Sequence, residues 1–172
     1  PHQKADFYGD IDSMFEQLHG KEISYNNMLD IDAAVNLIEE FAGGDPAFAI
    51  LKHNNACGLA VRPTLSEAWN TALSCDPVSA FGGVLICNRQ VDVATAEEVN
   101  KLFFEVIVAP GYDEAALETL KSKKNRIILV LKDATRGGRQ FRSLLNGVAV
   151  QARDTQLGGR DTELKTVHKE EV

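Results

Sequence analysis

The sequence lacks an excess of basic residues and any long apolar run. Its 172 residues include 18 Lys and Arg against 25 Asp and Glu, giving a net charge of -7. Nucleic acids and anionic membranes attract basic surfaces, so neither is expected as a partner. No apolar run approaches the roughly 20 residues of a membrane span, and the first residues do not resemble a signal peptide. We therefore expect a cytoplasmic protein that binds neither nucleic acid nor membrane.

Cysteine is scarce and is not arranged for metal binding. The three cysteines, Cys57, Cys75 and Cys87, stand at unrelated spacings, which predicts reduced and mostly buried thiols. A zinc deaminase needs His-x-Glu and Pro-Cys-x-x-Cys, whereas two asparagines follow His53 and no Cys-x-x-Cys occurs. A phosphate-binding loop of the Gly-x4-Gly-Lys type is also lacking. We expect no metal requirement.

What is present is an alternation of short apolar runs and amphipathic segments. Apolar runs of this length predict buried strands, and their alternation with helices over short connections predicts an α/β sandwich. Trp69 and Phe81 are expected in the core. The predicted strands are 47–51, 82–87, 105–109, 127–131 and 147–150, and the predicted helices begin at caps Asp30, Thr64, Thr95 and Asp113.

The apolar periodicity ends at Gln151. We therefore predict a folded domain over residues 1–150 and a polar tail or truncated linker over 151–172. The chain begins at Pro1 rather than at methionine, which suggests that it is a piece of a longer protein.

The predicted strand that ends at Leu51 is followed by Lys52, His53, Asn54 and Asn55. Ligands of open α/β sheets usually bind at the carboxyl ends of strands. One interpretation assigns these residues no function: the lysine is solvated, the histidine lies in a loop and the two asparagines form a turn. The other is a general base beside a fixed positive charge, because an ammonium favours the neutral, proton-accepting imidazole and can stabilise a developing oxyanion.

The segment Lys52-His-Asn-Asn-Ala-Cys-Gly58 resembles the Lys-His-x-Asn-Pro-Cys-Gly signature of a purine-biosynthesis family. The family is the bifunctional AICAR formyltransferase/IMP cyclohydrolase, and the match falls in its transformylase region. Ala56 replaces a frequent proline, which removes no side-chain chemistry. Further matches occur in the right order at residues 1–3, 18–27, 76–83 and 106–112.

This resemblance implies a fold and a reaction. The implied fold is the first of two cytidine-deaminase-like three-layer sandwiches, with a mixed sheet and flanking helices. The implied reaction transfers a formyl group from 10-formyltetrahydrofolate to the 5-amino group of 5-aminoimidazole-4-carboxamide ribonucleotide (AICAR). His53 would be the base and Lys52 would stabilise the oxyanion. Gly82 and Glu105 would contact the nucleotide, and Asn54 would orient substrate or simply shape a turn.

The resemblance also implies that this chain does not work alone. The folate site and other nucleotide contacts would come from a second subdomain and from the partner subunit of a homodimer. The isolated chain would then show little or no transformylase activity, and the parent protein would also carry the cyclohydrolase, a hydrolase. The alternative is a non-catalytic nucleotide-binding or assembly module on the same scaffold.

Overall fold

The computed structural model describes residues 5–133 and 137–154. The chain divides into two units, residues 1–134 and residues 135–172, and each is considered by itself. No helix among the described residues is long and apolar enough to cross a membrane.

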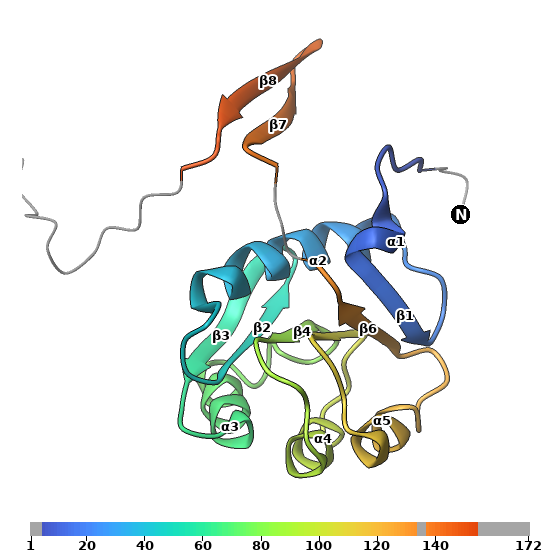
Figure 1. The fold of residues 1–172 in the computed structure, drawn as a ribbon, viewed down its shortest axis with the longest axis vertical. Coiled ribbons are helices and arrows are strands. Elements are labelled where there is room, and N and C mark those ends of the chain that lie inside the picture. The colour runs from blue at the N-terminus through green and yellow to red at the C-terminus, as the bar shows by residue number, and fades with distance from the viewer. Residues whose placement is uncertain (1–4, 134–136, 155–172) are drawn as a thin grey trace, which may run out of the picture. The chain divides into compact units, whose positions relative to one another are not determined.

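The first unit is built on a six-stranded mixed sheet with the strand order β1-β6-β5-β4-β2-β3 (Figure 1). β4, β5 and β6 run parallel, whereas β1 and the β2–β3 hairpin are antiparallel to their neighbours. The strands are β1 Phe15–His19, β2 Ala47–Lys52, β3 Asn55–Val61, β4 Val84–Cys87, β5 Val106–Ala109 and β6 Ile127–Leu131.

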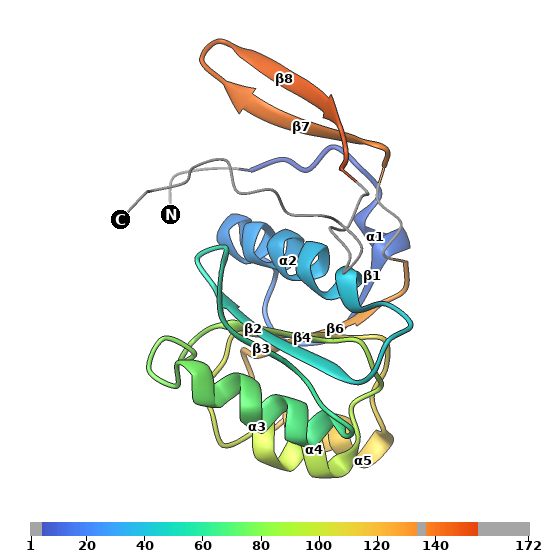
Figure 2. The same ribbon diagram turned by 90° about the vertical axis from the view of Figure 1, so that its left-hand side faces the viewer.

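Helices cover both faces of this sheet. α2 lies on one face, and α3, α4 and α5 lie on the other (Figure 2). This confirms an α/β fold with a mixed sheet and flanking helices. The helices are α1 Ile11–Met14, α2 Tyr25–Ile38, α3 Leu65–Cys75, α4 Val93–Val99 and α5 Glu114–Leu120, with a 3-10 turn at Glu39–Phe41 after α2.

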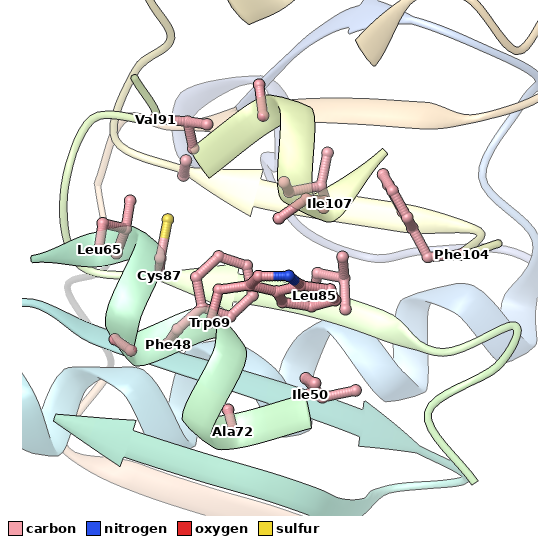
Figure 3. Close-up of a cluster of buried hydrophobic side chains, with 14 of the residues drawn as sticks. Phe48, Ile50, Leu65, Trp69, Ala72, Leu85, Cys87, Val91, Phe104 and Ile107 are labelled. Atoms are coloured by element: carbon pink, nitrogen blue, oxygen red, sulfur yellow. The ribbon is translucent and has the colours of Figure 1, made fainter. Parts of the chain in front are cut away.

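The alternation of side chains along β2 separates two apolar cores. Phe48 and Ile50 belong to the core under α3, whereas Ala49 and Leu51 belong to the core under α2. Trp69 is 1% exposed and meets Phe48 edge-on, with ring centroids 5.1 Å apart (Figure 3). The prediction that Trp69 is a core residue is confirmed. β2 is therefore buried on both faces up to Leu51.

Two predicted helix starts are wrong. α2 begins after Ser24 rather than Asp30, because Ser24 and Asn27 form a reciprocal capping box upstream of the predicted start. α4 begins after Asp92, whose carboxylate accepts from the backbone of Thr95, so Thr95 is inside the helix rather than its cap. The capping box at Thr64 is confirmed.

Two further predictions about side chains are wrong. Only Cys87 is buried, since Cys57 is half-buried and Cys75 is exposed. Phe81 is 58% exposed rather than part of the core, because the turn of residues 77–82 carries it off the sheet before β4 begins. All three cysteines are free.

The second unit is a two-stranded antiparallel hairpin of β7 Arg139–Leu144 and β8 Gly147–Ala152, orange in Figure 1. The predicted strand at 147–150 is confirmed as part of β8, but its partner β7 had no recognisable apolar alternation. β1 and β3 also escaped prediction, since only one of the five β1 residues is buried and β3 contains Gly58 and a bulge. Residues 155–172 of the predicted tail lie outside the described residues.

Candidate functional site

The predicted site residues gather at one edge of the sheet. β2 runs antiparallel to β4, so the carboxyl end of β2 lies beside the amino ends of β4 and β5, with Leu51 opposite Val84 and Val84 opposite Val106. We call this edge, with Lys52–Asn54, Phe81–Gly83 and Glu105, the Lys52 edge. The expected carboxyl end of a strand is thus correct for β2, although it coincides with the amino ends of the parallel strands.

His53 and Asn54 form the two-residue turn between β2 and β3. Both have positive φ, 52° and 63°, the combination found in the type I′ turns that suit hairpin twist. The Asn54 backbone N–H donates to Asp30 Oδ1 at 2.7 Å, and with the side-chain amide turned so that its nitrogen faces acceptors, that nitrogen lies 3.0 Å from the Leu29 carbonyl oxygen. The turn is thereby anchored to α2, and the His53 side chain is exposed at its tip.

Lys52 is held on the other side of the hairpin, towards α3. Its Nζ donates to the Phe81 carbonyl at 2.8 Å. Partial burial raises the pKa of the nearby Cys57 thiol, Asp76 raises it further, and the Lys52 charge opposes both. The Lys52 ammonium is thus held by the Phe81 carbonyl, and the residue remains half-exposed at the sheet edge.

Gly82 has a positive φ of 76° and donates its N–H to the Phe103 carbonyl at 2.8 Å. A Cβ on Gly83 would lie 2.7 Å from the Leu51 carbonyl oxygen. Glycine is therefore needed at both positions, at the first for its conformation and at the second for the close approach of two strands. The rings of Phe81 and Phe103 lie 5.1 Å apart and both are exposed.

Glu105 precedes β5 and joins this edge to α2. Its backbone N–H donates to Gly83 O at 3.0 Å. Its Oε2 accepts from Asn27 Nδ2 at 3.0 Å and lies 3.6 Å from Lys21 Nζ. Neither Asn27 nor Lys21 is among the predicted site residues, although both fall in a segment that resembles the family. The Ser24-x-x-Asn27 spacing was the available signal for Asn27.

Separate hydrogen bonds hold most of the predicted residues. They join Lys52 to Phe81, Gly82 to Phe103, and Glu105 to Asn27. Asn54 is anchored separately on α2 and His53 projects beside it. In residues 5–133 and 137–154, no three His, Cys, Asp or Glu side chains come together as a metal site.

Comparison with known proteins identifies the family of this chain. The AICARFT/IMPCHase bienzyme profile matches residues 1–172. The chain belongs to this bienzyme family. It is 66% identical to the bifunctional purine biosynthesis protein PurH of Bacteroides thetaiotaomicron over 157 aligned residues. This alignment covers 91% of this chain and 31% of the Bacteroides thetaiotaomicron protein.

Two Chlorobium relatives of the bienzyme family agree. The proteins of the same name from Chlorobium phaeovibrioides and Chlorobium luteolum are 49% and 47% identical over 178 aligned residues, covering 98% of this chain and 34% of each relative. The chain spans about a third of the length of the relatives that it matches.

Proposed function

We propose that this chain supplies catalytic groups for transfer of a formyl group from 10-formyltetrahydrofolate to AICAR, in the course of IMP synthesis. The carrying observation is the Lys52 edge, where a backbone-held ammonium and an exposed histidine flank the end of a buried strand. Family membership supports the reaction class. The enzyme would then be a cytoplasmic AICAR formyltransferase whose parent protein is also an IMP cyclohydrolase.

The chemistry needs a base and an anion-stabilising group. The 5-amino group of AICAR is conjugated with the imidazole ring and is a weak nucleophile, so His53 removes its proton as the nitrogen attacks the formyl carbon. Lys52 stabilises the oxyanion of the tetrahedral intermediate. Collapse of that intermediate breaks the bond to N10 of the folate, which takes up the proton that His53 removed and leaves as tetrahydrofolate.

The remaining predicted contacts hold the nucleotide. The Gly82 backbone lies against one side, and Glu105 accepts from a ribose hydroxyl or an exocyclic amine. Asn54, whose backbone and amide bind α2, orients the turn that carries His53. The folate site and other nucleotide contacts come from a second cytidine-deaminase-like subdomain and from the second subunit of a homodimer, and no metal takes part.

A chimera tests this proposal, with this sequence replacing the matching segment of the Bacteroides thetaiotaomicron relative. We expect the chimera to catalyse formyl transfer, and His53→Ala to lower kcat by about 10²- to 10⁴-fold, the usual contribution of a general base. His19→Ala on β1 is the matched control and should change kcat less than threefold.

Each contrary result is decisive. An inactive chimera, or full activity after His53→Ala, would favour the alternative, a nucleotide-binding or assembly module without catalytic groups. The isolated 172 residues should show little or no turnover, and robust activity from them would contradict the shared active site.

A further inference from the structure

We infer that Asn27 is a positioning residue that holds the Glu105 carboxylate for the nucleotide; this rests on the proposed function. Asn27 lies in the first turn of α2 and is only 6% exposed. Polar side chains are rarely buried without partners, so the bonds of its amide show what the residue is for.

The two ends of this amide have different partners. Asn27 Oδ1 accepts from the Ser24 hydroxyl at 2.8 Å and from the Ser24 backbone N–H at 3.4 Å. Since both groups are donors, the amide oxygen must face the start of the helix. The amide nitrogen therefore faces the opposite way, where Nδ2 donates to Glu105 Oε2 at 3.0 Å.

Asn27 restrains Glu105 more effectively than Lys21 does. Lys21 Nζ lies 3.6 Å from the same oxygen, but its side chain is 48% exposed and that of Glu105 39%. Exposed ion pairs are weakened by solvent and salt, whereas Asn27 is buried and fixed by the cap. Both contacts use Oε2, which leaves Oε1 of a held carboxylate to accept from the nucleotide.

Helix capping alone does not explain the amide. The capping box uses the backbone N–H and Oδ1 of Asn27, and an aspartate would provide both, with a negative charge that suits a helix amino terminus. Among residues 5–133 and 137–154, the amide nitrogen has its hydrogen bond with Glu105. Asn27→Asp thus keeps the cap but places one carboxylate against another, which separates the two roles.

The test uses the active chimera with AICAR as the varied substrate. We expect Asn27→Asp to raise the KM for AICAR at least tenfold while kcat changes less than threefold. Asn26→Asp makes the same substitution one residue earlier, at an exposed position, and should leave both constants within twofold. A merely structural role would lower the Tm of Asn27→Asp without this KM effect.

A second substitution tests the donor and acceptor directly. In the double variant Asn27→Asp with Glu105→Gln, the introduced glutamine amide can donate to the introduced aspartate and keep its own oxygen for the nucleotide. The KM should fall at least fivefold below that of Asn27→Asp alone. If Asn27→Asp leaves KM within twofold in a chimera that depends on His53, this inference fails and the proposed function stands. If the chimera is inactive or indifferent to His53, both fail.

Discussion

The two hairpins of this protein have the same connection length and very different surroundings. β2 and β3 are joined by His53 and Asn54, and β7 and β8 by Leu145 and Asn146. Phe48 and Ile50 of the first hairpin are fully buried. Every residue of β7 and β8 is exposed, including Phe141 at 69%.

The comparison shows what a hairpin needs in order to hold its turn in one position. A two-stranded ribbon is marginally stable in water by itself. The β2–β3 turn gains its fixed position from a strand buried on both faces and from the bonds of Asn54 to α2. Such support is what holds catalytic side chains in a productive geometry. The length of a turn is set locally, whereas its fixed position depends on the strands and helices packed around it.

The largest difference between the two hairpins should appear when one phenylalanine in each is truncated to alanine. Phe48→Ala should lower the free energy of unfolding by about 3–5 kcal/mol, because it leaves a cavity against Trp69. Phe141→Ala should change it by less than about 0.5 kcal/mol, as for other exposed positions. Urea unfolding followed by tryptophan fluorescence measures both. Equal losses would show that β7 and β8 are packed as tightly as β2 and β3.

A smaller effect is expected from an added methyl group. A Cβ on Gly58 would lie 2.0 Å from the Ala72 carbonyl oxygen of α3, so Gly58→Ala must push strand and helix apart. We expect Gly58→Ala to lower the free energy of unfolding by about 1–3 kcal/mol. Gly147 begins β8 and a Cβ there would meet nothing within 4 Å, so Gly147→Ala is the matched control. A neutral Gly58→Ala would contradict the close contact of β3 with α3.

The smallest effect concerns thiol reactivity rather than stability. Burial, with Asp76, raises the pKa of Cys57 on β3, so less of it is the reactive thiolate at about pH 8 than in a free cysteine. Its alkylation should be slower and should accelerate only at higher pH. Ser143→Cys, on exposed β7, should react like a free thiol. Mass spectrometry resolves the two sites in one protein, and equal rates would contradict the prediction.

Local patterns predicted the parts of this fold that depend on few neighbours. The apolar runs 47–51 and 127–131 are strands, and the Thr64 to Glu67 spacing is a capping box. The caps proposed at Asp30 and Thr95 are wrong because a better cap stood a few residues upstream in each case. Local sequence offers several plausible caps, and the helix packing selects among them.

The sequence by itself determined the α/β class and the buried strand that leads into Lys52, and it made Lys52 and His53 candidates. These depend on apolar periodicity and on residue chemistry, which the chain order states directly, whereas Glu105 became a candidate only through the resemblance to the family. Only the tertiary structure decided that Asn27 would meet Glu105, 78 residues away, and that Phe81 would be exposed. Both results depend on how the strands pair. Strand pairing brings together segments that are far apart in the sequence, and no local pattern predicts which segments will meet.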